Sequence, residues 1–112
     1  MTRFPAPTEA DIQRVVDLVV QTVSPLRVVL FGSAARGELR NGSDLDIMVV
    51  VPEGVDTLRT AQALHVARSR AGVTGVPVDF MVVTPSEFER HKQSIGMVYR
   101  EVVRDGRDLY VA

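Results

Sequence analysis

Apolar residues recur along the chain with two different periods, which predicts a protein that mixes helices and strands. Helical spacing is found in the first stretch, where the apolar residues are Ile12, Val15, Val16, Val19, Val20 and Val23. Thr8 precedes them and is a favourable N-cap residue, whereas Ser24-Pro25 ends the stretch. Residues 8–23 are therefore predicted to form an amphipathic helix with a buried apolar face.

Short, nearly continuous apolar runs are typical of strands that are buried on both faces. In chain order they are residues 27–31, 44–51 and 76–83, followed by a shorter run at 109–111 that predicts an edge strand. The third run contains a single charged residue, Asp79. A lone carboxylate in a buried strand would be costly unless it had a partner.

The segments between these runs carry helix signals. A short helix is expected over 33–40, ended by a turn at Asn41-Gly42. A longer helix, beginning at Asp56 or Thr57 and ending at about 71, is expected to bury Leu58, Ala61, Leu64 and Ala67. Two further helices are expected, one beginning at Pro85 and one from Ser94 to about Arg104. The whole pattern predicts an α/β (α+β) fold, in which a small mixed β-sheet is backed by helices.

Size and composition narrow the class of protein. The 112 residues suit one domain over 1–112, with 1–7 as a loose lead-in, and 46% of them are hydrophobic, as in ordinary soluble proteins. The absence of cysteine excludes disulfides and thiolate chemistry, and two scattered histidines do not suit a zinc site. A net charge of −1 argues against direct nucleic-acid binding. With no signal peptide and no long apolar run, we expect a cytoplasmic protein without membrane contact.

The residues that could bind a ligand or take part in a reaction lie where two predicted strands meet the adjoining loops. The first strand runs into Gly32-Ser33, and the second opens with Asp44 and Asp46. Side chains two apart on a strand project to the same side, with Cα atoms roughly 6.5 Å apart, so these carboxylates would repel each other without a cation. A glycine-serine turn offers close backbone approach and a hydroxyl to a phosphate. Together these features indicate a metal-nucleotide site, which Asp79 would join from the neighbouring strand.

Each residue also has a simpler interpretation. Gly32-Ser33 could be only a tight turn, and Asp44 and Asp46 only the end of a turn and a solvated acid. Asp79 could be an edge-strand charge that prevents pairing with other sheets. Arg36 could bind a phosphate or lie on a solvated face. For Ser43 we favour capping of the turn before Asp44 over contact with a metal-bound water.

Taken together, Gly32-Ser33, ten intervening residues and Asp44-Leu45-Asp46 resemble the signature of the DNA polymerase β-like nucleotidyltransferase superfamily. The chain looks most like its minimal nucleotidyltransferase (MNT) group, which includes antitoxins of HEPN-type ribonuclease toxins. The resemblance implies a nucleotidyltransferase fold and Mg²⁺-dependent transfer of a nucleoside monophosphate, such as AMP from ATP.

The resemblance also assigns roles to residues. It implies that Asp44, Asp46 and Asp79 are catalytic and bind two Mg²⁺ ions, with Asp79 also activating the acceptor hydroxyl. Gly32 and Ser33 would bind the β,γ-phosphates, and Arg36 and Ser43 would lie at the nucleotide. Two metal ions close together stabilise both the attacking and the leaving oxygen of an in-line displacement, which agrees with this assignment.

The acceptor is less well defined than the donor. Larger relatives add a helical acceptor-binding domain, for which we expect no room in this chain, so a partner chain or a homodimer would supply acceptor recognition. The leading hypothesis is an antitoxin that modifies a hydroxyl of a separately encoded HEPN-type partner. The alternatives are a non-catalytic antitoxin or nucleotide-binding module that acts by occlusion, and a small-molecule (aminoglycoside-type) nucleotidyltransferase.

Overall fold

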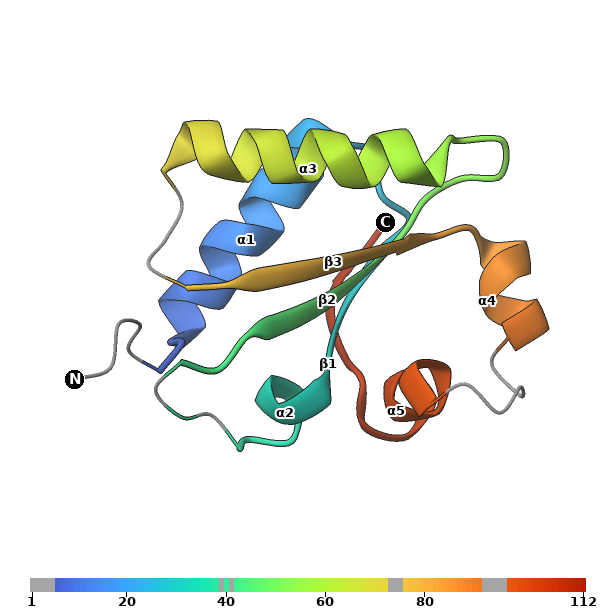
Figure 1. The fold of residues 1–112 in the computed structure, drawn as a ribbon. Helices are drawn as coiled ribbons and strands as arrows, with labels where there is room; N and C mark the ends of the chain where they lie inside the picture. The colour runs from blue at the N-terminus through green and yellow to red at the C-terminus, as the bar shows by residue number, and fades with distance from the viewer. Residues whose placement is uncertain (1–5, 39, 41, 73–75, 92–96) are drawn as a thin grey trace.

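A four-stranded mixed sheet forms the centre of the molecule (Figure 1). This computed structural model describes residues 6–38, 40, 42–72, 76–91 and 97–112. The strands are β1 (Arg27–Phe31), β2 (Leu45–Val50), β3 (Val78–Val83) and β4 (Arg107–Val111), in the order β3-β2-β1-β4. Strands β2 and β3 are parallel, whereas β1 is antiparallel to both β2 and β4. The predicted mixed sheet and the predicted edge position of the last strand are therefore confirmed.

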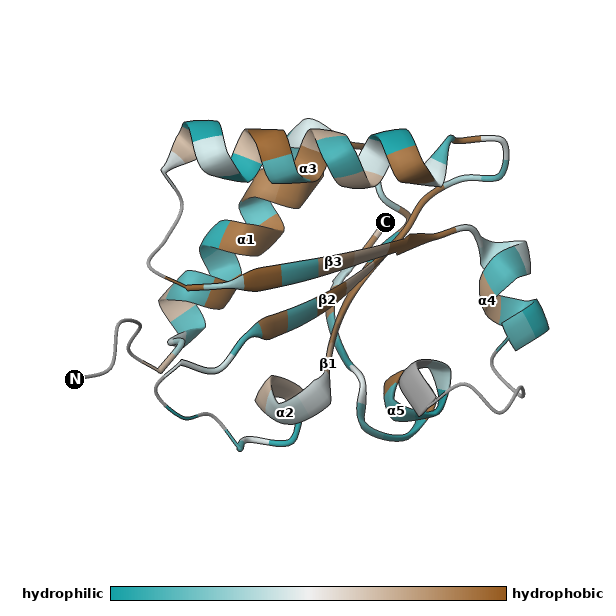
Figure 2. Cartoon of the chain, viewed as in Figure 1, coloured by the Kyte–Doolittle hydropathy of each residue, from teal (hydrophilic) through white to brown (hydrophobic). Residues whose placement is uncertain are grey.

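Helices cover both faces of the sheet. In chain order they are α1 (Glu9–Thr22), α2 (Gly32–Ala35), α3 (Thr57–Ala71), α4 (Pro85–His91) and α5 (Met97–Asp105). Helices α1 and α3 lie over one face, and α4 and α5 pack against the other (Figure 1). Figure 2 shows the apolar residues gathered on the strands and on α1, while α4 is largely hydrophilic.

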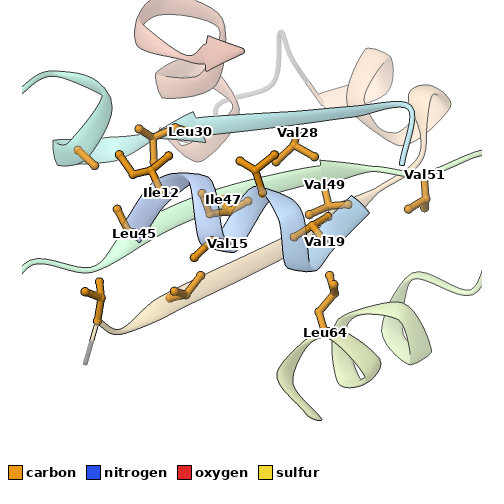
Figure 3. Packing of buried hydrophobic residues seen from close by; sticks show 14 residues of the cluster. Ile12, Val15, Val19, Val28, Leu30, Leu45, Ile47, Val49, Val51 and Leu64 are labelled. Carbon is orange, nitrogen blue, oxygen red and sulfur yellow. The ribbon is translucent and has the colours of Figure 1, made fainter. Parts of the chain in front are cut away.

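The larger core lies between α1, α3 and the sheet. Ile12, Val15 and Val19 of α1 face the strands, and Leu64 approaches from α3 (Figure 3). The predicted helix cap is also present, since the Thr8 hydroxyl accepts the Asp11 backbone N–H and the Asp11 carboxylate accepts that of Thr8. The periodicity of the first stretch therefore predicted both the helix and its buried face.

A second, smaller core lies on the opposite face. It is built by alternate residues of the strands together with a residue of α5: Val29, Phe31, Met48, Val50, Val83 and Val102. Phe88 of α4 and Tyr99 of α5 pack against it, with ring centroids 6.0 Å apart. Because side chains alternate along a strand, residues of even number on β2 and odd number on β1 and β3 face this side.

Two predictions about helices need correction. Leu58 is 68% exposed, so its predicted burial on α3 is wrong. Successive helical residues turn by 100°, which places Leu58 about 120° around the helix from the fully buried Leu64, whereas the buried Thr60 lies on Leu64's side. The short helix after β1 begins at Gly32 and ends at Ala35, earlier than Arg40.

Other predicted boundaries fall outside the described residues, namely Asn41 of the turn and Ser94 at the start of the last helix. Within the described ranges, no helix is both long and apolar enough to cross a membrane.

Candidate active site

The turn after β1 contains a glycine at a position where no other residue type fits. Gly32 has φ +74°, a left-handed conformation that side chains rarely adopt. A Cβ at this position would collide with the carboxylate of Asp46, whose Cγ would lie only 3.2 Å away. The backbone of the Gly32-Ser33 turn therefore lies directly against Asp46, and the two halves of the sequence motif are in contact.

The sheet register places the predicted third acid beside the second. Asp46 on β2 and Asp79 on β3 are register partners, and neighbouring strands lie about 4.8 Å apart. Both belong to the set of strand residues that faces the α5 side of the sheet. Residues 33 positions apart in sequence are thus brought together by strand pairing.

The environment of Asp79 differs from the prediction. Strand β3 is an edge strand whose Val78 and Val83 are buried and whose residues between them, other than Asp79, are half-buried. The expected buried strand is therefore confirmed only in part, because the Asp79 side chain is exposed. An edge position agrees with the simpler interpretation of Asp79 as an edge-strand charge, and the register agrees equally with a role beside Asp46. The exposure leaves the carboxylate open to approach from solvent.

The pKa of the Asp46 carboxylate is shifted by its surroundings. Partial burial raises its pKa above the ordinary value, and the nearby carboxylates of Asp79, Asp44 and Glu101 raise it further. The guanidinium of Arg36 acts in the opposite direction and lowers the pKa of Asp46. Asp44 is exposed and lies just before β2, on the chain leading into Asp46.

The donor set suits a hard divalent cation, because carboxylate oxygens are the ligands that Mg²⁺ prefers and the local charge disfavours the ionised form of Asp46. Among the described residues, however, no three His, Asp or Glu side chains are gathered as a ready metal-ligand group. Two carboxylates from adjacent strands are in register, and the third would have to be drawn in when the cation binds. The three-carboxylate metal site remains a prediction.

Arg36 and Ser43 lie in the loop that joins the two halves of the motif. The Arg36 Nε donates to Glu38 Oε1 at 3.2 Å, and its Nη1 lies 3.8 Å from Glu101 Oε1. The Ser43 hydroxyl accepts the backbone N–H of Arg40 at 2.9 Å, so the preferred capping role for Ser43 is confirmed. Nucleotide contact by either residue remains a prediction.

Sequence reasoning missed Glu101. It lies 55 positions after Asp46, and no spacing in the sequence relates it to the motif. Its proximity depends on how α5 packs across the sheet, where α2 and α5 are in contact. The one local feature is that Glu101 precedes Val102, which lies on the buried side of α5, so Glu101 stands next to the face that packs on the sheet.

An apolar cavity of about 300 Å³ lies elsewhere, lined by residues that include Leu26, Val50, Phe88 and Val111. Val50 pairs with Arg27 at the start of β1, whereas Asp46 pairs with Phe31 at its end. The cavity is therefore at the opposite end of the sheet from the carboxylates and is not the candidate active site.

A fold of this kind, with a glycine-serine turn against paired strand carboxylates, defines a class of nucleotide-handling protein. Residues 12–107 match the family model for the nucleotidyltransferase domain, and the chain belongs to that family. The match includes Gly32, Ser33, Asp44, Asp46 and Asp79.

Solved structures give a consistent picture. A protein provisionally assigned as a minimal nucleotidyltransferase is 29% identical, with 88% of each chain covered and a TM-score of 0.55. A toxin–antitoxin complex with AMP-PNP contains a chain 24% identical, covering 89% of this chain and 73% of that one, with a TM-score of 0.57.

An MNT antitoxin in complex with the tri-AMPylated HEPN toxin of Shewanella oneidensis shares the fold at 19% identity. Here 93% of this chain and 72% of that one are covered, with a TM-score of 0.54. No protein of curated function matches the chain. The expected nucleotidyltransferase fold and the likeness to the MNT group are thus confirmed.

Proposed function

We propose that this chain is a Mg²⁺-dependent nucleotidyltransferase that transfers AMP from ATP to a hydroxyl group of a partner protein. The observation that carries the proposal is the pairing of Asp46 with Asp79 on adjacent strands, with the Gly32 backbone against the Asp46 carboxylate. A nucleotidyl transfer needs carboxylates and a phosphate-binding turn within reach of the same phosphorus, and the contact between the Gly32 turn and Asp46 supports this assignment.

Each candidate residue would bind either the metal ions or the phosphates of the nucleotide. Asp44, Asp46 and Asp79 would hold two Mg²⁺ ions, which when bound supply positive charge for the phosphates and the leaving group. The Gly32-Ser33 turn would hold the β,γ-phosphates, since the missing side chain of Gly32 lets the backbone approach closely. A nucleotide held in this way would have its α-phosphorus within reach of Asp79.

One phosphorus–oxygen bond would form and another would break, while a proton moves from the acceptor hydroxyl to Asp79. The acceptor oxygen attacks the α-phosphorus, the bond from that phosphorus to the β-phosphate oxygen breaks, and pyrophosphate leaves. Asp79 accepts the proton of the attacking hydroxyl as general base. Its exposed position on the edge strand β3 would let a bulky acceptor approach, which supports a protein acceptor.

The nature of the partner is proposed from the neighbours. One of them is an MNT antitoxin found with an AMPylated HEPN toxin, and another comes from a toxin–antitoxin complex with AMP-PNP. We therefore propose a separately encoded HEPN-type protein as the acceptor, with the chain acting as its antitoxin in the cytoplasm.

The decisive experiment is label transfer. The chain, a candidate HEPN-type partner, Mg²⁺ and α-labelled ATP should give a labelled partner, and Asp44→Asn or Asp46→Asn should abolish the label. Asp17→Asn is a suitable control, because Asp17 is exposed on α1, which lies over the other face of the sheet. Retained labelling by both site variants would eliminate the proposed metal chemistry.

The same variants separate the alternatives. If Asp44→Asn still neutralises the toxin fully, the chain acts by occlusion as a non-catalytic antitoxin. Labelling of an aminoglycoside by the chain without any partner would instead support a small-molecule nucleotidyltransferase.

A further inference from the structure

Helix α5 brings a carboxylate to the candidate active site from the far end of the chain. Its residue Val102 is buried in the second core, against the face of the sheet that carries Asp46 and Asp79. Gly106, just after the helix, has no room for a Cβ, which would lie 2.9 Å from Val29 Cγ1 on β1. Close packing at both points fixes the position of the neighbouring Glu101.

Glu101 forms an ion pair with Arg36, whose guanidinium acts on the Asp46 carboxylate. Its Oε1 lies 3.8 Å from Arg36 Nη1, and each of the two side chains is 30% exposed. In the described part of the chain, the charges that act on Asp46 are those of Arg36 and of the carboxylates of Asp79, Asp44 and Glu101. Glu101 and Arg36 thus belong electrostatically to the same site, although α5 contributes nothing to the sequence motif.

We propose that Glu101 is a positioning residue, which holds the Arg36 guanidinium at the site so that it can bind the phosphates of the nucleotide. This inference rests on the proposed function, because it requires a nucleotide at the Gly32-Ser33 turn. It assigns to the C-terminal helix a role in nucleotide binding that acts through Arg36.

The donor count supports this assignment. A guanidinium has five N–H donors in a rigid plane. Within the described residues, Nε of Arg36 contacts the Glu38 carboxylate and Nη1 that of Glu101. Donors therefore remain for a phosphate after the ion pairs are formed. A long arginine side chain loses rotamer freedom on binding a ligand, and a carboxylate that already restrains it reduces that cost.

Glu101 is the better anchor of the two carboxylates. Glu38 follows Arg36 by two residues in the same loop and its side chain is 56% exposed. Glu101 is carried by a packed helix and approaches from another element. Restraint by an independently fixed group defines the place of Arg36 relative to β1 and β2.

A double-mutant cycle on nucleotide affinity tests the proposal. The dissociation constant of ATP in the presence of Mg²⁺ is measured by calorimetry for the wild type, Glu101→Gln, Arg36→Gln and the double variant. Loss of charged hydrogen bonds to phosphate should weaken binding by Arg36→Gln about tenfold or more. Glu101→Gln should weaken it about threefold to fivefold, in keeping with a partly exposed ion pair, and should have no further effect once Arg36 is replaced.

Asp108→Asn is the matched control, because it removes a carboxylate from another partly exposed ion pair, with Arg27 at 2.6 Å. It should leave ATP affinity unchanged, and thermal unfolding of both variants shows how much stability each loses.

The outcomes separate the two proposals. If the wild type binds no ATP, the proposed function and the role of Glu101 both fall. If the wild type binds ATP and Glu101→Gln binds it equally well or more tightly, only the positioning role is overturned. An effect of Glu101→Gln that persists without Arg36 would likewise show that Glu101 does not act through it.

Discussion

At the scale of single residues, Gly32 combines two constraints that no other residue type satisfies. Its φ of +74° disfavours any side chain, and a Cβ would enter the space of the Asp46 carboxylate. Because the two groups lie so close together, a side chain at position 32 would displace the Asp46 carboxylate.

Replacement of this glycine should therefore harm the site more than the fold. Gly32→Ala is expected to displace the Asp46 carboxylate, abolish Mg²⁺-ATP binding, and destabilise the protein by about 1–3 kcal/mol. Gly37→Ala is the matched control, because Gly37 has the same φ of +74° but a Cβ there would meet only open space. Calorimetry and urea unfolding of both variants measure the difference. Equal ATP affinity in the two variants would contradict the prediction.

The raised pKa of Asp46 predicts a dependence of stability on pH. Because the folded state raises this pKa, the folded protein holds the proton to higher pH than the unfolded chain does. At a pH below the pKa values of both states, the ionisation of Asp46 therefore contributes nothing to the free energy of unfolding. It lowers this free energy as the pH rises through the raised pKa.

Asp46→Asn should consequently stabilise the protein at neutral pH without Mg²⁺ and have a smaller effect near pH 3. Urea unfolding at both pH values measures this, with Asp17→Asn as the control for removal of an exposed acid. A stabilisation of equal size at both pH values would rule out the electrostatic cause.

At the scale of elements, two leucines of α3 are expected to contribute very differently to the stability of the protein. Leu64 is completely buried against α1 and the sheet, whereas Leu58 is 68% exposed. Leu64→Ala should cost about 2–5 kcal/mol through the cavity that it leaves. Leu58→Ala should change the free energy of unfolding by less than about 0.5 kcal/mol, as expected for a surface site. Urea denaturation of the two variants compares them directly, and similar losses would mean that α3 is rotated from its position in this structure.

At the scale of the whole molecule, the two faces of the sheet differ in the size of the core that they carry and in the presence of the carboxylates. The α1 and α3 face contains the larger core, and the α5 face contains the smaller core together with the carboxylates at one end. A nucleotide bound at that end should stabilise the folded state, because it binds the folded protein and not the unfolded chain. At an ATP concentration 100 times the dissociation constant, Mg²⁺-ATP should stabilise the protein by about 2.7 kcal/mol.

This stabilisation should disappear in Asp46→Asn and persist in Asp17→Asn. Thermal unfolding with and without Mg²⁺-ATP measures it for all three proteins. A shift of the melting temperature that is the same in Asp46→Asn as in the wild type would place nucleotide binding away from Asp46.

The sequence alone determined the elements and the residues of the motif. Periodicity predicted the buried face of α1, the apolar runs predicted the strands, and the spacing from Gly32-Ser33 to Asp44 and Asp46 indicated the chemistry, because these signals are local. Which strand lies at an edge, which side of α3 is buried, and how α5 packs are decided by contacts between residues far apart in the chain. For that reason only the tertiary structure showed that Asp79 is exposed but in register with Asp46, that Leu58 faces solvent, and that Glu101 reaches Arg36.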